Sequence, residues 1–121
     1  MIDPHALGIE VRHLRYFLAV FEELHFGRAA LRLGITRPPL ARAIQALEVG
    51  LGVALFRRSR GSLTPTAAAE AFALESRSVL TKLELAVVET RRVAAAVPGQ
   101  APSLGTHKAL ADCARDARDD S

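Results

Sequence analysis

The sequence predicts a mainly α-helical fold with one small β-hairpin, a long C-terminal helix and a disordered tail, and three observations lead to this prediction. Apolar residues recur at helical spacing through the first half of the chain. Glycine and proline divide this half into short elements, but neither occurs from residue 66 to residue 97. Half of the 121 residues are hydrophobic, whereas only 5% are aromatic and tryptophan is absent, which favours an aliphatic helical core.

Two short helices are expected after a leader at residues 1–8. The first begins at Val11, and the second runs from Phe26 to Gly34, because a left-handed glycine commonly ends a helix. The apolar faces of the two helices are formed by Leu14, Phe17, Leu18, Phe21, Phe26, Ala29, Ala30 and Leu33.

A third helix is predicted to follow Thr36, which suits the N-cap position. Pro38 and Pro39 fall in its first turn, where a missing N–H costs little, and Gly50 and Gly52 end it. The residues on its buried face are Leu40, Ile44, Leu47 and Leu51, and those left outside are Thr36, Arg37, Ala41, Arg42 and Gln45.

A hairpin and a long helix complete the prediction. Residues 53–56 are expected to form a strand, residues 57–62 a basic turn, and Leu63 to begin the return strand. A helix over residues 65–97 would be roughly 45 to 50 Å long at 1.5 Å per residue.

The long helix carries an apolar row near heptad spacing, interrupted by Ser76 and Thr90. A second copy of the same helix is the simplest partner for such a row, so a homodimer is expected. The candidate dimerisation residues are Phe72, Val79, Leu83, Ala86 and Val93.

Basic residues are concentrated in one segment of the chain. Residues 28–60 contain seven arginines and a single acid, Glu48, a net formal charge of +6, whereas the whole chain carries only +3. Residues 98–121 contain three basic and four acidic residues and few large apolar ones, so this tail is expected to be disordered. Taken alone, the arginine cluster is equally compatible with a solvated face and with a nucleic-acid surface.

Two short helices joined by a tight turn, the second with exposed polar residues at its start, can place one helix in the major groove of DNA. The basic hairpin beside this pair of helices would be a wing that contacts the phosphate backbone or the minor groove.

Several segments closely resemble the LysR-type transcriptional regulators, namely residues 23–30 (ELHFGRAA), 38–40 (PPL) and 51–56 (LGVALF), with residues 12–17 (RHLRYF) similar to that family's first helix. The resemblance implies a sequence-specific, duplex-DNA-binding transcription regulator. It implies a winged domain over residues 9–67 with its helix-turn-helix at residues 26–45, a dimerising linker helix over residues 65–97 and a C-terminal effector-binding domain. With the resemblance, DNA binding is favoured over a solvated face. The candidate DNA-binding residues are Arg28, Thr36, Arg37, Pro38, Pro39, Arg42, Gln45, Arg58 and Arg60.

The chain departs from the family pattern in places. Arg37 stands where the family usually has glutamine, Ala41 where it has serine or threonine, and Ala69 where a glycine follows the wing. Where the effector domain would begin, the sequence continues into the tail at residues 98–121. We therefore expect that this short form lacks the effector domain and responds to no small-molecule effector, as a truncated or frame-shifted reading of a longer gene would.

Other chemistries find no support in the sequence. A single cysteine, Cys113, provides neither an internal disulfide nor a cysteine-based zinc site. The histidines lack metal-ligand spacing, and neither a phosphate loop nor a convincing carboxylate pair is present, so no enzyme activity, cofactor or metal is expected. With no signal-peptide layout and no membrane-length apolar stretch, a cytoplasmic protein is expected. The histidines, His5, His13, His25 and His107, are expected to be surface or packing residues.

The sequence is compatible with three hypotheses about function. The chain could be a regulator that is active in its short form, an interaction protein that forms mixed dimers with full-length relatives, or a non-functional fragment. An intact basic helix favours the first two.

Overall fold

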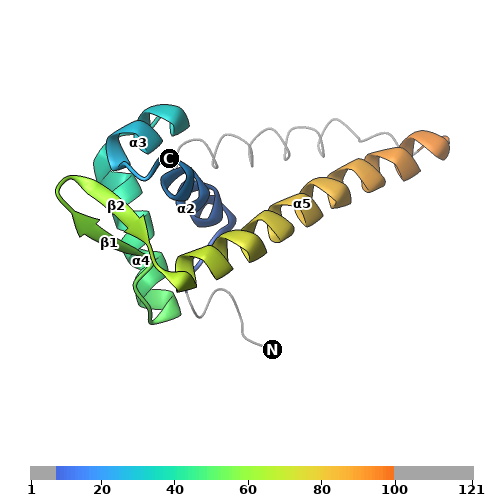
Figure 1. Ribbon diagram of the computed structural model, residues 1–121. Helices are drawn as coiled ribbons and strands as arrows, with labels where there is room; N and C mark the ends of the chain where they lie inside the picture. The colour runs from blue at the N-terminus through green and yellow to red at the C-terminus, as the bar shows by residue number, and fades with distance from the viewer. Residues whose placement is uncertain (1–7, 100–121) are drawn as a thin grey trace. The chain divides into compact units, whose positions relative to one another are not determined.

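The computed structural model describes residues 8–99. The expected leader (apart from Gly8), the expected tail from residue 100 onward, and His5, His107 and Cys113 lie outside the described residues. The elements in chain order are α2 (Val11–Glu23), α3 (Phe26–Leu33), α4 (Arg37–Leu51), β1 (Phe56–Ser59), β2 (Ser62–Pro65) and α5 (Ala67–Ala96) (Figure 1). The described chain is thus mainly helical with a two-stranded antiparallel wing, which confirms the predicted fold class.

The chain divides into two units at Thr81 and Lys82, and the core lies in the first. Phe17 is fully buried, and its ring centroid lies 5.8 Å from that of Phe21, 5.7 Å from that of Phe56 and 5.0 Å from that of Phe72. Each fully buried large side chain contributes about 1.5–3 kcal/mol relative to exposure. The predicted helix faces are confirmed: the buried members are Leu14, Phe17, Leu18, Ala29, Ala30, Leu40, Ile44 and Leu47, and the half-buried ones are Phe21, Phe26, Leu33 and Leu51.

The helices begin and end at the predicted capping residues, with two differences. Gly34 and Gly52 are the left-handed C-caps of α3 and α4, with φ of 71° and 73°, while Gly50 lies within the last turn of α4. Thr36 occupies the N-cap position of α4, as expected, but its side chain makes no capping hydrogen bond. The hydroxyl of Thr36 is therefore not engaged by the helix that it precedes.

His13 stabilises the start of α2. Its Nδ1 accepts a hydrogen bond from the backbone N–H of Glu10 at 3.1 Å, and the side chain is buried. Burial lowers the pKa of His13 from its ordinary value, an effect that the nearby Glu10 opposes and Arg12 assists. This histidine is a packing residue, as expected.

The wing begins later than the sequence suggested. Residues 53–55, expected as a strand, are not in the sheet, and β1 instead includes Arg57 and Arg58, which were expected in the turn. The turn itself is Arg60–Gly61, both left-handed with φ of 49° and 80°. Such a two-residue turn matches the twist of a hairpin.

Hydrogen bonds from outside the hairpin hold the backbone of Ala54 and Leu55, which do not pair with a strand. The backbone N–H of Leu55 donates to Glu48 Oε2 at 2.7 Å. The hydroxyl of Thr66 donates to the carbonyl of Ala54 at 2.8 Å, and the backbone N–H of Thr66 donates to the carbonyl of Leu55 at 2.9 Å. Residues 53–55 therefore find their hydrogen bonds outside the hairpin.

Helix α5 begins at Ala67, two residues after the expected start, because Pro65 belongs to β2 and Thr66 caps the helix by accepting a hydrogen bond from the N–H of Ala69 at 3.2 Å. Its first half contributes Ala69, Ala73 and Ser76 to the core. In the second unit, the described residues 82–99 are exposed except for Ala94. Within residues 8–99, no helix has the length and apolar character needed to cross a membrane.

Candidate nucleic-acid interface

Helix α4 presents a polar and basic face at its N-terminus. Leu40, Ile44 and Leu47 anchor the opposite side of the helix in the core. The candidate DNA-binding residues on α4 and its cap are exposed, apart from the half-buried Pro39: Thr36, Arg37, Pro38, Arg42 and Gln45. An α-helix that exposes such residues at its start can enter the major groove, so α4 is called the reading helix below.

Two shallow grooves connect the reading helix to the wing. The first, about 290 Å³, is bounded by Gln45 of α4 and Arg58 of β1, and the second, about 260 Å³, by Arg37 of α4 and the same Arg58. Residues far apart in the sequence thus line the same depressions. The exposed polar and basic candidates of α4, its cap and the wing, called the groove face, are Thr36, Arg37, Arg42, Gln45, Arg58 and Arg60.

Within residues 8–99, none of the groove-face arginines forms an ion pair with an acid. Glu48, the single acid in residues 28–60, lines the first groove, and its carboxylate accepts the hydrogen bond from Leu55. The four groove-face arginines outnumber this one carboxylate, so the groove face can attract an anion such as a phosphate group.

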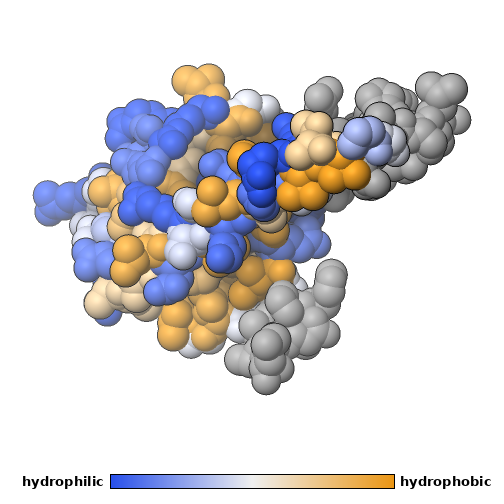
Figure 2. All heavy atoms as spheres, turned by 90° about the vertical axis from the view of Figure 1, so that its right-hand side faces the viewer, coloured by the Kyte–Doolittle hydropathy of each residue, from blue (hydrophilic) through white to orange (hydrophobic). Residues whose placement is uncertain are grey.

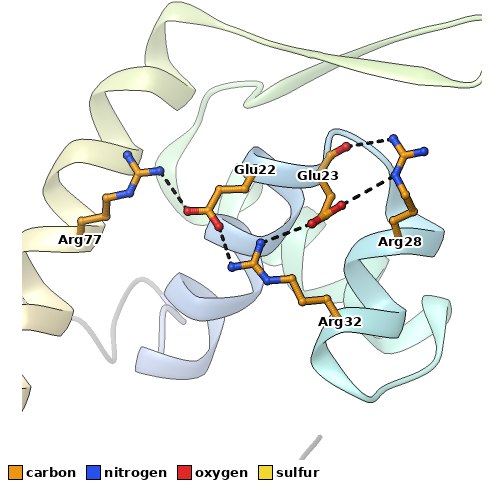
Figure 3. A network of polar contacts seen from close by, with 5 residues as sticks. All are labelled: Glu22, Glu23, Arg28, Arg32 and Arg77. Carbon is orange, nitrogen blue, oxygen red and sulfur yellow. Dashed lines mark hydrogen bonds and ion pairs between the residues drawn. The ribbon is translucent and has the colours of Figure 1, made fainter.

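Arg28 and Arg32, which were counted with this basic segment, have acidic partners instead. Arg32 Nη2 lies 2.6 Å from Glu22 Oε1 and Arg32 Nη1 lies 3.5 Å from Glu23 Oε2 (Figure 3). Arg28 Nε lies 3.7 Å from Glu23 Oε1, and Arg28 Nη2 donates to the Glu23 carbonyl at 3.2 Å. The net charge of +6 over residues 28–60 thus overstates the available positive charge, because the compensating acids lie on α2.

The same carboxylates connect α2 to α5. Arg77 Nη2 lies 3.1 Å from Glu22 Oε2, so Glu22 accepts from two arginines on two helices (Figure 3). The hydrogen bond from Arg32, with a further one from Arg77, lowers the pKa of Glu22, and the same bond raises the pKa of Arg32. These five residues, Glu22, Glu23, Arg28, Arg32 and Arg77, are called the acid-paired cluster.

The sequence did not indicate the parts played by His25, Phe26 and Phe56. His25 is the N-cap of α3, and its Nδ1 accepts a hydrogen bond from the N–H of Arg28 at 3.1 Å. Phe26 and Phe56 line the first groove, and the ring of Phe26 lies 5.2 Å below the guanidinium of Arg58. A histidine or phenylalanine at helical spacing gives no sign of such roles, since the partners come from other elements. No cluster of potential metal ligands occurs in residues 8–99.

The candidate dimerisation residues have different surroundings. Val79, Leu83 and Val93 are 47%, 41% and 47% exposed, and Ala86 is also exposed. Phe72 instead packs edge-on against Phe17 in the core. Ser76, expected to interrupt the apolar row, is only 2% exposed and contributes to the core of the first unit, where its hydroxyl has no hydrogen-bond partner among the described residues.

Comparison with known proteins identifies this arrangement. The bacterial regulatory helix-turn-helix proteins of the lysR family match residues 11–70. The uncharacterized HTH-type transcriptional regulator YnfL of Escherichia coli K12 is 49% identical over 87 residues, which cover 72% of this chain and 29% of YnfL. The HTH-type transcriptional regulator AlsR of Bacillus subtilis is 44% identical over 86 residues, which cover 71% of this chain and 28% of AlsR. The chain therefore spans less than a third of the length of these relatives.

Solved structures show the same fold. The CbnR_DBD–DNA complex superposes with a TM-score of 0.69 at 40% identity, covering 71% of this chain and 99% of that one. The BenM_DBD/catB site 1 DNA complex gives a TM-score of 0.68 at 41% identity, covering 71% and 97%. Both are complexes of regulator domains with DNA. The chain belongs to the lysR family of bacterial regulatory helix-turn-helix proteins, and residues 11–70 are its DNA-binding regulator domain.

Proposed function

We propose that the chain binds specific sequences in duplex DNA and regulates transcription, with the reading helix α4 in the major groove and the wing on the phosphate backbone. The observation that carries the proposal is that Arg58 of the wing lines one groove with Gln45 of α4 and another with Arg37 of α4, on a face whose four arginines form no ion pair within residues 8–99. The similarity to domains solved on DNA supports the same assignment. A bacterial protein that binds the chromosome acts in the cytoplasm.

The groove-face residues divide by the chemistry that they offer. Arg37 and Arg42 can each donate two hydrogen bonds to the edge of a guanine. Gln45 can donate one hydrogen bond to N7 of an adenine and accept one from its N6 amino group. Thr36, with its hydroxyl unengaged, and Pro38 and Pro39 lie at the positively polarised start of α4, where a phosphate is favoured. Arg58 and Arg60 would provide phosphate contacts. Arg28 would contribute less to DNA affinity, because Glu23 offsets the charge of its guanidinium.

Sequence specificity is tested by enrichment. The full chain is used to select duplexes from a random-sequence library, and its affinity for the selected duplex is compared with that for a scrambled duplex of equal composition. A specific regulator should prefer the selected duplex by about 10³-fold or more at physiological salt. Equal affinity for the two duplexes would contradict the proposal.

The chain is further proposed to act as a dimer through α5. Val79 and Leu83 each leave more than two-fifths of their surface exposed, and Figure 2, viewed from the side on which α5 ends in Figure 1, shows apolar residues at the surface. Full burial of a side chain of this size contributes about 1.5–3 kcal/mol, and about half of it remains available here. A dimer would present two reading helices to half-sites one or more whole DNA turns apart.

Leu83→Glu tests the dimer, because it would introduce a charge into the apolar row. Sedimentation across a concentration series should show a wild-type dimer and a monomeric variant, and the variant should bind paired half-sites no better than single ones. Glu84→Gln, a neighbouring exposed change, is the control. A wild-type chain that remains monomeric with and without DNA would remove the dimer. Co-purification with a full-length relative would favour the alternative of mixed dimers.

A further inference from the structure

We infer that Phe26 is a positioning residue for DNA binding, whose ring holds the guanidinium of Arg58 between the wing and the reading helix. The inference rests on the proposed function and deepens it, because it assigns a role to an aromatic residue that acts through another side chain. The juxtaposition that carries it is an exposed arginine of the wing lying over a half-buried ring at the first position of α3.

Arg58 lies where the two grooves meet. The guanidinium carbon of Arg58 is 5.2 Å from the centroid of the Phe26 ring. Both residues line both grooves, whereas Gln45 lines only the first and Arg37 only the second. The stacked pair therefore lies between two parts of the reading helix, where an arginine can reach the same stretch of DNA as α4.

The backbone builds this contact. Leu24 adopts a left-handed conformation with φ of 53°, and its carbonyl accepts a hydrogen bond from the N–H of Leu63 in β2 at 3.3 Å. Leu63 is the partner of Arg58 across the hairpin. Because Phe26 follows Leu24 by two residues, the hydrogen bond that ties the wing to the end of α2 also brings Arg58 over the ring.

The first turn of α3 fixes the position of the Phe26 ring. The imidazole of His25 caps the helix through the N–H of Arg28, and Gly27 leaves room for it, since a Cβ at residue 27 would lie 2.8 Å from His25 Cε1. Phe26 lies between His25 and Gly27 in the sequence, and its side chain packs against the core. The cap and the core contact therefore define the position of the ring.

A stacked arginine is better prepared for a phosphate than a mobile one. Arginine loses conformational entropy when a contact fixes it, and a ring that already restrains its planar guanidinium reduces that loss. A cation–π contact needs no acceptor atom, so the guanidinium N–H groups remain available for phosphate oxygens. A cation–π contact of this exposed kind raises the population of the held guanidinium about two- to fivefold, and this is the largest gain in affinity that the restraint can give.

A double-mutant cycle on the full chain tests the inference, with Phe26→Leu, Arg58→Ala and their combination. The probe is one duplex of fixed random sequence, titrated at constant salt with folded protein quantified for each variant. Phe26→Leu should weaken binding about two- to fivefold in the wild-type background and should have no effect when residue 58 is alanine. Phe26→Tyr, which keeps the ring, should restore wild-type affinity.

Phe21→Leu is the matched control, because Phe21 also lies beneath an arginine, Arg77, at 5.7 Å, outside both grooves. It should leave the affinity for the duplex unchanged. If Phe26→Leu does not fold, Phe26→Met provides the measurement, since methionine is apolar and of similar length but lacks the ring, and the same loss is expected.

Three results would overturn the inference. One is an equal loss from Phe26→Leu in both backgrounds, which would mean that the ring acts only through packing. Another is wild-type affinity for Phe26→Leu, or for Phe26→Met if that variant is used instead. The third is an unchanged affinity for Arg58→Ala, which would remove the wing from the proposed function as well, whereas the first two would leave that function intact.

Discussion

Two arginine-rich regions of this domain have opposite electrostatic environments. In the acid-paired cluster, Glu22 and Glu23 of α2 lie within 4 Å of three arginines on α3 and α5. On the groove face, none of the four arginines forms an ion pair within residues 8–99, and the neighbouring Glu48 accepts a hydrogen bond from the Leu55 N–H. Arginine content alone therefore does not locate a DNA-binding surface; what decides is whether the fold brings carboxylates to the same place.

The largest difference in DNA affinity between variants of the two regions is expected for a residue that reads a base. Arg42→Ala should weaken binding to the selected duplex by about 1–3 kcal/mol and binding to the scrambled duplex by less, because a bidentate base contact is lost. Arg32→Ala, in the acid-paired cluster, is the matched control and should change neither affinity appreciably. Equal losses of Arg42→Ala on both duplexes would indicate a phosphate contact, and no loss on either would remove α4 as the reading helix.

The wing should act on salt dependence rather than on sequence preference. Replacing Arg58 and Arg60 together with alanine should flatten the slope of log affinity against log salt by about two, or 0.9 per lost phosphate contact. The preference for the selected over the scrambled duplex should change little. Titrations over a series of salt concentrations measure both quantities, and a slope equal to that of the wild type would place the wing away from DNA.

The smallest effect is expected in the acid-paired cluster, on stability alone. Glu22→Gln should lower the free energy of unfolding by about 0.2–1 kcal/mol, since the carboxylate is partly exposed and screened by solvent. The pKa of Glu22 is lowered in the folded state, so this stabilisation is present above the ordinary pKa, near 4.5, and is lost as the pH falls below it.

Denaturant unfolding of the wild type and Glu22→Gln at neutral and acidic pH measures this contribution. The two curves should converge as the pH falls. A difference that persists or grows at acidic pH, or a marked loss of DNA affinity in Glu22→Gln, would show that the cluster is not a purely structural set of ion pairs.

The sequence predicted the helices and most of their buried faces because both depend on local patterns. Gly34 and Gly52 end α3 and α4 where the periodicity stops, and the apolar faces of α2 and α4 recur every three or four residues. The exposed side of α4 follows from the same periodicity. These features need only local information.

The remaining features depend on contacts across the fold. The hydrogen bonds that exclude residues 53–55 from the sheet come from Glu48, seven positions from its partner, and Thr66, twelve positions from its partner. Glu22 and Arg77 are separated by 55 positions, so a charge count over residues 28–60 could not include their pairing. The stacking of Arg58 on Phe26 likewise needs the link between Leu24 and Leu63.

The most direct test of the central claim compares two charge-matched double variants on the same random-sequence duplex. Arg42→Ala with Arg58→Ala removes two charges from the groove face, and Arg32→Ala with Arg77→Ala removes two from the acid-paired cluster. The account predicts that the first variant flattens the salt slope by about one, since Arg58 is its phosphate contact, whereas the second leaves it unchanged. An equal change of slope in the two variants would contradict it, since the domain would then attract DNA by net charge and not by its groove face.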